Sequence, residues 1–289
     1  MKKQVFVLIT TLVLLLSIVT SSLSKPDTDR VPAVVNPSGR IVIIPAHAIQ
    51  VASGVFDLGT TTVDDEVLQG YMFVDYKKGF THKPNHKPGN TTNGGATSTC
   101  FAFMSQGARW KNTEPYVLNT TNSDGMTATF VDSVTATSLD AWDSQVAFEI
   151  FGNRNTSAEV DGADTSAPDN KNEVFFGNIA EPGAIAVTIV WGIFSGPPQT
   201  RKLVEFDAVF DDVDFFWSDA GSTSETSLGN TSIMDYQNIA THEFGHGAGM
   251  GHPSDSCTEE TMYRFAQSGE TKKRTLNAGD IDGVKKLYK

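Results

Sequence analysis

One eleven-residue segment, HEFGHGAGMGH at residues 242–252, constrains this chain more than any other part of it. On a helix, His242 and His246 lie about one turn apart, so both imidazoles project from the same face and reach a single metal ion. Gly249 permits a left-handed backbone conformation, which ends the helix and turns His252 back toward the same ion. The spacing therefore predicts a metal centre with three imidazole ligands.

The residue types in this segment favour hydrolytic zinc chemistry. Three neutral imidazoles leave the fourth position of a tetrahedral zinc ion open for water, as in catalytic rather than structural sites. Zinc lowers the pKa of such a water to about 7. Glu243 follows the first ligand and is predicted to act as the general base that passes the water's proton to a leaving amine. The predicted reaction is hydrolysis of a peptide bond.

Three other interpretations compete with this one. Incidental histidines on a buried helix would not explain the spacing, because the chain has only 6 histidines in 289 residues. A secreted zinc-stabilised binding module without peptidase activity keeps the metal, but the intact Glu243 argues against it. A zinc hydrolase acting on a non-peptide bond keeps the chemistry and changes only the cleft.

The first 24 residues have the layout of a secretory signal peptide. Lys2 and Lys3 precede an uncharged apolar run at residues 5–19, and small polar residues follow it. The run is shorter than the roughly 20 residues of a membrane-spanning helix, so we expect a secreted protein with no stable membrane insertion after signal cleavage. The formal net charge of −12 and the lack of an extended basic run exclude an electrostatic case for a nucleic-acid partner.

Composition predicts two regions after the signal. Residues 25–80 contain short β-rich pieces and form a small N-terminal pro- or accessory region. Residues 81–99 are rich in Pro, Gly, Asn, Thr and Lys, which is typical of a linker, and the catalytic domain is expected at residues 100–289. An inhibitory, a chaperone and an accessory role all stay open for the region before Cys100.

Hydrophobic periodicity predicts an α+β domain. A helix is expected at residues 125–144, a second from Ser232 with Asp235 in a capping box, and a third at residues 278–288. Strands are expected at residues 116–118, 147–151, 174–179, 184–191 and 203–210.

Residues 242–252 match the extended zinc motif of the metzincins, and Met262 lies ten residues past His252, where that clan has its Met-turn. Over roughly residues 100–289 the chain most resembles the matrixin branch (peptidase M10 type). The resemblance implies a twisted mixed five-stranded sheet with one helix packed on it, an active-site helix and a C-terminal helix. It also implies a zinc endopeptidase whose protein or peptide substrate binds as an extended strand along the sheet edge, with Met262 beneath the metal; a plain core role for Met262 is the alternative.

Two residues after the Met-turn are candidates for the substrate pocket. Tyr263 adjoins Met262 as in matrixins, whereas Pro253 is more like the serralysin branch, which normally has a tyrosine where this chain has Arg264. The resemblance implies that Tyr263 and Arg264 wall the pocket for the residue after the scissile bond. A surface charge is the alternative for Arg264.

The resemblance also bears on further metals. Val209 replaces the histidine that binds a second, structural zinc in matrixins, so one zinc ion is expected. Asp211 and Asp214 fall on the family's carboxylate pair for structural calcium, a cation that prefers oxygen ligands. Solvated acidic side chains are the alternative.

The two cysteines are predicted to pair with each other. Matrixin zymogens carry a propeptide cysteine in a Pro-Arg-Cys-Gly motif, and Cys100 is not in that context. A switch role for Cys100 would leave Cys257 as an odd thiol in an exported chain, so a Cys100–Cys257 disulfide is the preferred interpretation.

Overall fold

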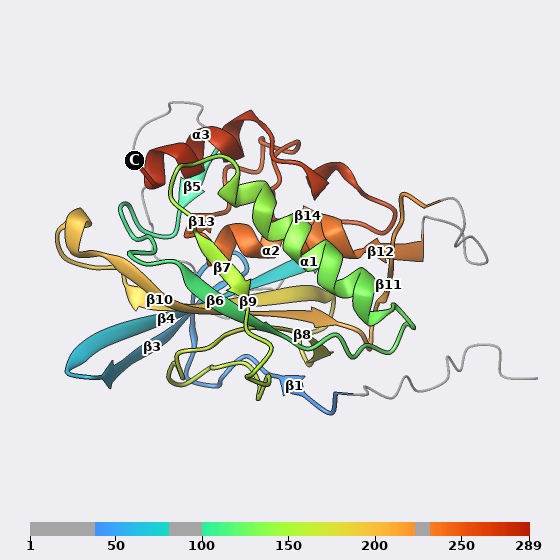
Figure 1. Cartoon of the computed structure of the whole chain (residues 1–289), viewed down its shortest axis with the longest axis horizontal. Helices are drawn as coiled ribbons and strands as arrows, with labels where there is room; N and C mark the ends of the chain where they lie inside the picture. Colours follow the sequence, from blue (N-terminus) through green and yellow to red (C-terminus); the bar gives the residue numbers. More distant parts are fainter. Residues whose placement is uncertain (1–37, 81–99, 223–231) are drawn as a thin grey trace, which may run out of the picture. The chain divides into compact units, whose positions relative to one another are not determined.

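The computed structural model describes residues 38–80, 100–222 and 232–289, and all of them lie in one compact unit, Val34–Lys289 (Figure 1). The expected signal peptide and the expected linker at residues 81–99 lie outside the described residues. In the described ranges, no helix has both the length and the apolar character needed to cross a bilayer.

A mixed sheet of ten strands forms the centre of this unit. The strands follow the order β2-β3-β4-β9-β10-β8-β6-β7, with β1 beside β8 and β14 beside β4. Their bounds are β1 (Ile41–Val42), β2 (Ile49–Ala52), β3 (Val55–Val63), β4 (Glu66–Lys77), β6 (Glu114–Leu118), β7 (Phe151–Arg154), β8 (Asn172–Ile179), β9 (Ala184–Ile193), β10 (Lys202–Asp211) and β14 (Phe265–Ala266). Two small pairs stand apart, β5 (Ala102–Phe103) with β13 (Met250–Gly251), and β11 (Phe216–Ser218) with β12 (Ile233–Asp235).

The sheet is larger than the five strands expected because the N-terminal region joins it. Strands β6 to β10 correspond to the five expected strands, although β7 begins at Phe151, where the expected strand ends. Strand β4 pairs with β9 in antiparallel register, and β3 and β2 follow it outward. The N-terminal strands therefore share a sheet and a hydrophobic core with the elements that follow Cys100.

Three helices accompany the sheet, as expected: α1 (Ala128–Asp143), α2 (Tyr236–Gly247) and α3 (Ala278–Leu287). Two short 3-10 turns occur at η1 (Pro198–Thr200) and η3 (Lys272–Arg274). The expected start of the second helix at Ser232 is wrong, because residues 233–235 pair with β11 as β12 and Asp235 is itself the N-cap. Its side chain accepts a hydrogen bond from the Asn238 amide.

The two faces of the sheet carry separate hydrophobic clusters. One cluster packs the sheet against α1 and α2, which lie on the same face (Figure 1). There the indole of Trp142 in α1 donates a 2.8 Å hydrogen bond to the Thr241 carbonyl in α2. The other cluster joins β3, β4 and β9 to Val42 of β1 and Val160 of the loop before β8. Helix α2 packs against β9 and β10 through the first of these clusters.

Candidate metal centre and active site

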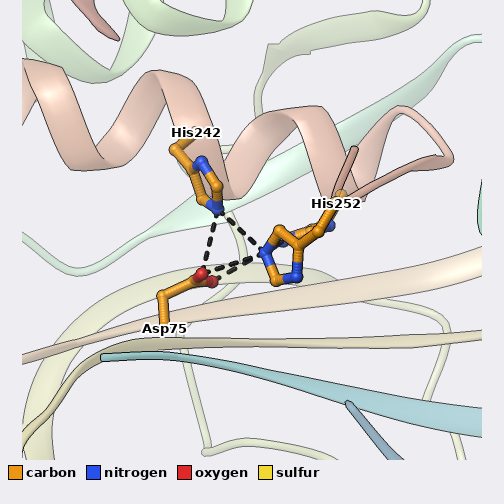
Figure 2. Close-up of side chains that lie close together, drawn as sticks. Asp75, His242 and His252 are labelled. Atoms are coloured by element: carbon orange, nitrogen blue, oxygen red, sulfur yellow. Dashed lines mark hydrogen bonds and ion pairs between the residues drawn. The ribbon is translucent and has the colours of Figure 1, made fainter. Parts of the chain in front are cut away.

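Helix α2 and the turn after it bring three imidazoles together. His242 and His246 lie on successive turns of α2, and Gly249 then takes a φ of +95°, which reverses the chain toward β13 and His252. The Nε2 atom of His252 lies 3.3 Å from that of His242 and 3.1 Å from that of His246. The structure therefore places all three predicted ligands around one point, and Figure 2 shows His242 and His252 of this set.

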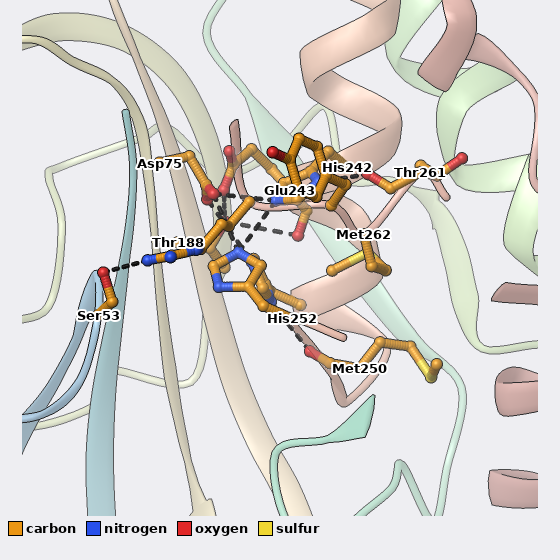
Figure 3. A network of polar contacts seen from close by, with 12 residues as sticks. Ser53, Asp75, Thr188, His242, Glu243, Met250, His252, Thr261 and Met262 are labelled. Carbon is orange, nitrogen blue, oxygen red and sulfur yellow. Dashed lines mark hydrogen bonds and ion pairs between the residues drawn. The ribbon is translucent and has the colours of Figure 1, made fainter. Parts of the chain in front are cut away.

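Backbone carbonyls orient two of these rings. The Nδ1 atom of His242 lies 2.5 Å from the Thr261 carbonyl (Figure 3). That of His246 lies 2.9 Å from the Met250 carbonyl. Because a carbonyl only accepts, each Nδ1 carries the proton and each Nε2 lone pair points to the centre. Burial lowers the pKa of His242 to about 3 and also lowers that of His252, so both rings are neutral, as metal ligands must be.

A carboxylate that sequence reasoning missed completes the centre. Asp75 extends from β4, and its Oδ1 lies 3.1 Å from His242 Nε2 and 3.0 Å from His252 Nε2 (Figure 2). Its Oδ2 lies 3.6 Å from His246 Nε2. The only signal in the sequence was a charged residue in the apolar run YMFVDY, which does not by itself indicate a ligand.

These atoms suit a divalent cation. One ligand atom from each of the four side chains lies within 4.8 Å of all the others, and both Asp75 oxygens are buried without a hydrogen-bond donor. Nitrogen lone pairs and carboxylate oxygens that face one another repel unless a cation lies between them. A set of imidazole nitrogens with one carboxylate oxygen fits zinc, which His242, His246 and His252 would hold.

Glu243 lies directly beside these ligands. Its Oε2 accepts a 2.6 Å hydrogen bond from the Thr188 hydroxyl on β9, and its Oε1 is buried without a donor (Figure 3). Burial, and after it the nearby charge of Asp75, raise the pKa of Glu243 well above its ordinary value. Thr188 thus orients a carboxyl group that binds a proton tightly.

The Met-turn packs under α2 and supports His242. Met262 is fully buried, and a Cβ atom on Gly245 would lie only 2.2 Å from its sulfur, so the helix needs glycine there. The amides of Thr261 and Met262 donate to the two carboxylate oxygens of Asp280 in α3, at 2.7 and 3.2 Å. Asp280 therefore fixes the turn whose carbonyl holds His242, a role that the sequence pattern of α3 did not indicate.

The residues after Met262 face the N-terminal region. Arg264 pairs with Asp255, lies 4.5 Å from the Phe265 ring centroid, and donates to the hydroxyl of Ser53 between β2 and β3. The Tyr263 carbonyl accepts a hydrogen bond from the buried Lys273 ammonium. The pocket role of Tyr263 and Arg264 stays a prediction.

Asp211, one of the two residues predicted to bind calcium, is buried at the end of β10. Oδ1 of Asp211 accepts hydrogen bonds from the amides of Val213 and Asp214, and its Oδ2 is buried without a donor. Burial raises the pKa of Asp211 to about 7. In the described parts of the chain, the carboxylates that converge in threes lie elsewhere, in the groups Asp161, Asp169, Glu173 and Asp164, Asp169, Glu205. Calcium at Asp211 and Asp214 stays a prediction.

The predicted disulfide is present. Cys100 and Cys257 are joined with their Cα atoms 5.5 Å apart. The bond links Cys100, two residues before the start of β5, to the segment between His252 and Met262. Since β5 pairs with β13, both connections hold the chain near His252.

Known proteins resemble parts of this chain. Metalloendoproteinase 1 of Glycine max is 38% identical over 77 residues, which is 27% of this chain and 24% of that protein. Matrilysin of Homo sapiens is 39% identical over 82 residues, covering 28% of this chain and 26% of that protein. Metalloendoproteinase 5-MMP of Arabidopsis thaliana is 37% identical over 68 residues, covering 24% of this chain and 18% of that protein.

The matches to these relatives thus span about a quarter of their length or less. The family model described as Matrixin, Peptidase_M10, matches residues 109–289, a range that holds α2, the three histidines and the Met-turn. That range is more than half of the chain, and its α+β fold of a mixed sheet with three helices agrees with the resemblance read from residues 242–252. This chain belongs to the matrixin family.

Proposed function

We propose that this chain is a secreted zinc-dependent endopeptidase in which Glu243 acts as general base. The observation that carries the proposal is the convergence of three imidazole Nε2 atoms directly beside a buried carboxyl group. Membership of the matrixin family supports it, and so do the names of the metalloendoproteinases that resemble about a quarter of this chain. The signal peptide expected at residues 1–24 supports secretion, which N-terminal sequencing of chain recovered from the medium tests.

The metal and the protein side chains have different roles in the proposed reaction. A zinc ion held by the three histidines supplies Lewis acidity that makes water nucleophilic at neutral pH. Glu243 accepts the proton of the attacking water and returns it to the departing amine nitrogen. The Thr188 hydroxyl holds the Glu243 carboxyl in one orientation during both transfers. The raised pKa of Glu243 suits a group that must keep this proton until the peptide bond breaks.

The proposed substrate is a protein or peptide in extended conformation. Strand β9 carries Thr188 and runs past Glu243, so its edge is the place where main-chain pairing would align a peptide with the general base. Such pairing contributes affinity with little sequence preference.

The decisive assay compares Asp75→Ala with Asp75→Ala/Glu243→Ala, because the Asp75 carboxylate fills the space that a water molecule needs. We expect zinc-loaded Asp75→Ala to cleave casein or a mixed peptide library. Removal of Glu243 should lower the rate about 10²- to 10⁴-fold, and a chelator should abolish cleavage until zinc is restored. Cleavage that survives both treatments would show that another group does the chemistry.

One observation favours a second function, a zinc-stabilised binding module without peptidase activity. Three histidines and Asp75 together make four protein ligands, the number typical of closed structural zinc sites. A folded, zinc-loaded Asp75→Ala variant that binds peptides but cleaves no member of a broad peptide library would favour this alternative.

A further inference from the structure

Strand β4 occupies the edge of β9 that borders the active site. Its residues pair with β9 in antiparallel register from Gln69 opposite Gly192 to Tyr76 opposite Ala184. On its other side, Tyr76 and Lys77 pair with β14, which follows the Met-turn. Strand β4 therefore fills the slot between β9 and β14. Without it, β9 would present free N–H and C=O groups beside the general base, the arrangement that extended peptides recognise.

The side chains of β4 that face α2 cover the metal ligands. Alternate residues of a strand share a face, so Tyr71, Phe73 and Asp75 point the same way. The Phe73 ring stacks on the His246 ring with a centroid separation of 4.1 Å. Asp75, two residues further along β4, reaches the Nε2 atoms of all three histidines. The pairing register shifts between Asp75 and Tyr76, and a bulge of this kind re-aims the side chain beside it.

The surroundings of the Asp75 carboxylate point to a metal ligand. Its side chain is only 7% exposed, and neither oxygen receives a hydrogen bond. The Asp75 oxygens lie 3.0 to 3.6 Å from three imidazole nitrogens, and the protons of His242 and His246 are committed to carbonyls on the far side of the rings. A buried carboxylate among acceptors is stable only when a cation joins them.

We propose that Asp75 is a fourth ligand of the metal and that β4 is a built-in inhibitor that keeps this chain latent. The inference rests on the proposed function, since a catalytic zinc site needs the fourth position free. The Asp75 carboxylate excludes water from the metal, and the backbone of β4 excludes substrate from β9. We do not expect the metal centre to cleave β4 at this position. The group beside the imidazoles is the side-chain carboxylate of Asp75 and not a peptide bond.

The covalent structure allows this inhibition to end. Residues 38–80 contain no cysteine, and the disulfide joins Cys100 to Cys257, beyond them. After a backbone break between Phe80 and Cys100, β4 would be held by strand pairing, side-chain packing and the Asp75 ligand alone. The metal centre and the disulfide would both remain with the C-terminal piece.

The test uses the full chain with cobalt(II) in place of zinc, because cobalt reports its ligands by visible absorption. We compare the wild type with Asp75→Ala, with the isosteric Asp75→Asn, and with Gln69→Ala as a control. Gln69 also lies on β4, but its side chain donates to Asp57, not to the metal ligands. Added azide should change the spectra of Asp75→Ala and Asp75→Asn and leave the wild type and Gln69→Ala unchanged. Zinc affinity should fall at least about tenfold in the two Asp75 variants only.

Peptide cleavage is measured in parallel, so that the two proposals fail separately. We expect Asp75→Ala to cleave at least tenfold faster than the wild type and Gln69→Ala, because β4 without its metal ligand is held less firmly and a peptide can compete with it for β9. Spectra that respond to azide and to a saturating peptide, without any cleavage, would keep Asp75 as the ligand and reject the peptidase. Spectra that respond to azide but not to the peptide would keep Asp75 as the ligand and show that β4 still covers β9. Spectra and zinc affinity that match the wild type in both Asp75 variants would overturn the fourth ligand, whatever the activity.

Discussion

At the scale of single residues, the hydroxyl of Thr188 is the only hydrogen-bond donor that the structure places on the Glu243 carboxyl among the described side chains. In the Asp75→Ala background, we expect Thr188→Val to lower kcat about tenfold, the equivalent of losing roughly 1.4 kcal/mol of hydrogen bonding. The zinc content should not change, because the hydrogen bonds of the Thr188 hydroxyl go to Glu243 and not to a metal ligand. Steady-state kinetics with metal analysis measures both quantities.

The same substitution should move the pH profile in a defined direction. The bond from Thr188 stabilises ionised Glu243, so removing it raises the pKa of that carboxyl further. A general base works only when ionised, so the acidic limb of the kcat/KM profile should shift to higher pH. Thr62→Val, an exposed change on β3, serves as the control. An unshifted acidic limb would contradict the orienting role of Thr188.

Asp211 makes a prediction about stability. Burial raises its pKa to about 7 in the folded state, from an ordinary value of 3.8. The folded chain then binds this proton more tightly than the unfolded chain, so its contribution to stability is complete below about pH 4 and is lost as pH rises through about 7. Relative to Asp211→Asn, the free energy of unfolding of the wild type should fall by about 2 to 4 kcal/mol between pH 4 and pH 8 in the presence of a calcium chelator.

The Asp211 experiment, repeated with calcium, tests whether a cation binds this carboxylate. A cation bound at Asp211 would stabilise the ionised form and remove most of the loss at pH 8. Urea denaturation at both pH values, with and without calcium, measures the effect, and the exposed Asp214→Asn shows whether the second carboxylate takes part. Parallel pH curves for the wild type and Asp211→Asn would show that Asp211 keeps an ordinary pKa.

At the scale of elements, α3 supports the metal centre without touching it. Asp280 accepts the amides of Thr261 and Met262, and Thr261 in turn accepts from His242. We expect Asp280→Ala to lower the free energy of unfolding by about 2 to 4 kcal/mol, because two buried amides lose their partner, and to lower zinc affinity about 10- to 100-fold. Thermal melts and competition with a zinc chelator measure the two effects.

Asp282 offers the matched control for this experiment. It lies two positions away in α3 and is exposed, so Asp282→Ala keeps the helix and removes an equal charge. Its stability and zinc affinity should match the wild type. If Asp280→Ala lowered stability but left zinc affinity unchanged, Asp280 would have a structural role alone.

The elements also show where sequence reasoning succeeds. The third helix was predictable because Ile281, Val284 and Leu287 make an apolar stripe at helical spacing, and the turn after α2 because Gly249 permits a positive φ. The start of α2 was predicted too early because Ser232 and Asp235 have the spacing of a capping box, although Asp235 itself is the N-cap. Pairing of residues 233–235 with β11, a contact between segments, decided the outcome.

At the scale of the whole molecule, the three histidines were predictable and Asp75 was not, for the same physical reason. The histidines lie within eleven residues, so local helix geometry alone brings them together. Asp75 reaches them only because β4 pairs with β9, and strand pairing over such a separation leaves no periodic trace in the sequence. The apolar pattern of β4 indicated a strand, but not which edge it would join.

The disulfide makes the last prediction, also at this scale. Cys100 and Cys257 are 157 residues apart, so their bond closes most of the C-terminal domain into one loop. In the chain-entropy model, a loop of this length stabilises the folded state by about 5 kcal/mol relative to the reduced chain. We expect Cys100→Ser/Cys257→Ser to lose much of this stability, seen as a lower melting temperature and a lower urea midpoint. Zinc stoichiometry should stay the same, because β5 still pairs with β13 ahead of His252. The wild type under reducing conditions should melt at the same temperature as the double variant. If both melted at the temperature of the oxidised wild type, tertiary packing alone would restrain this loop.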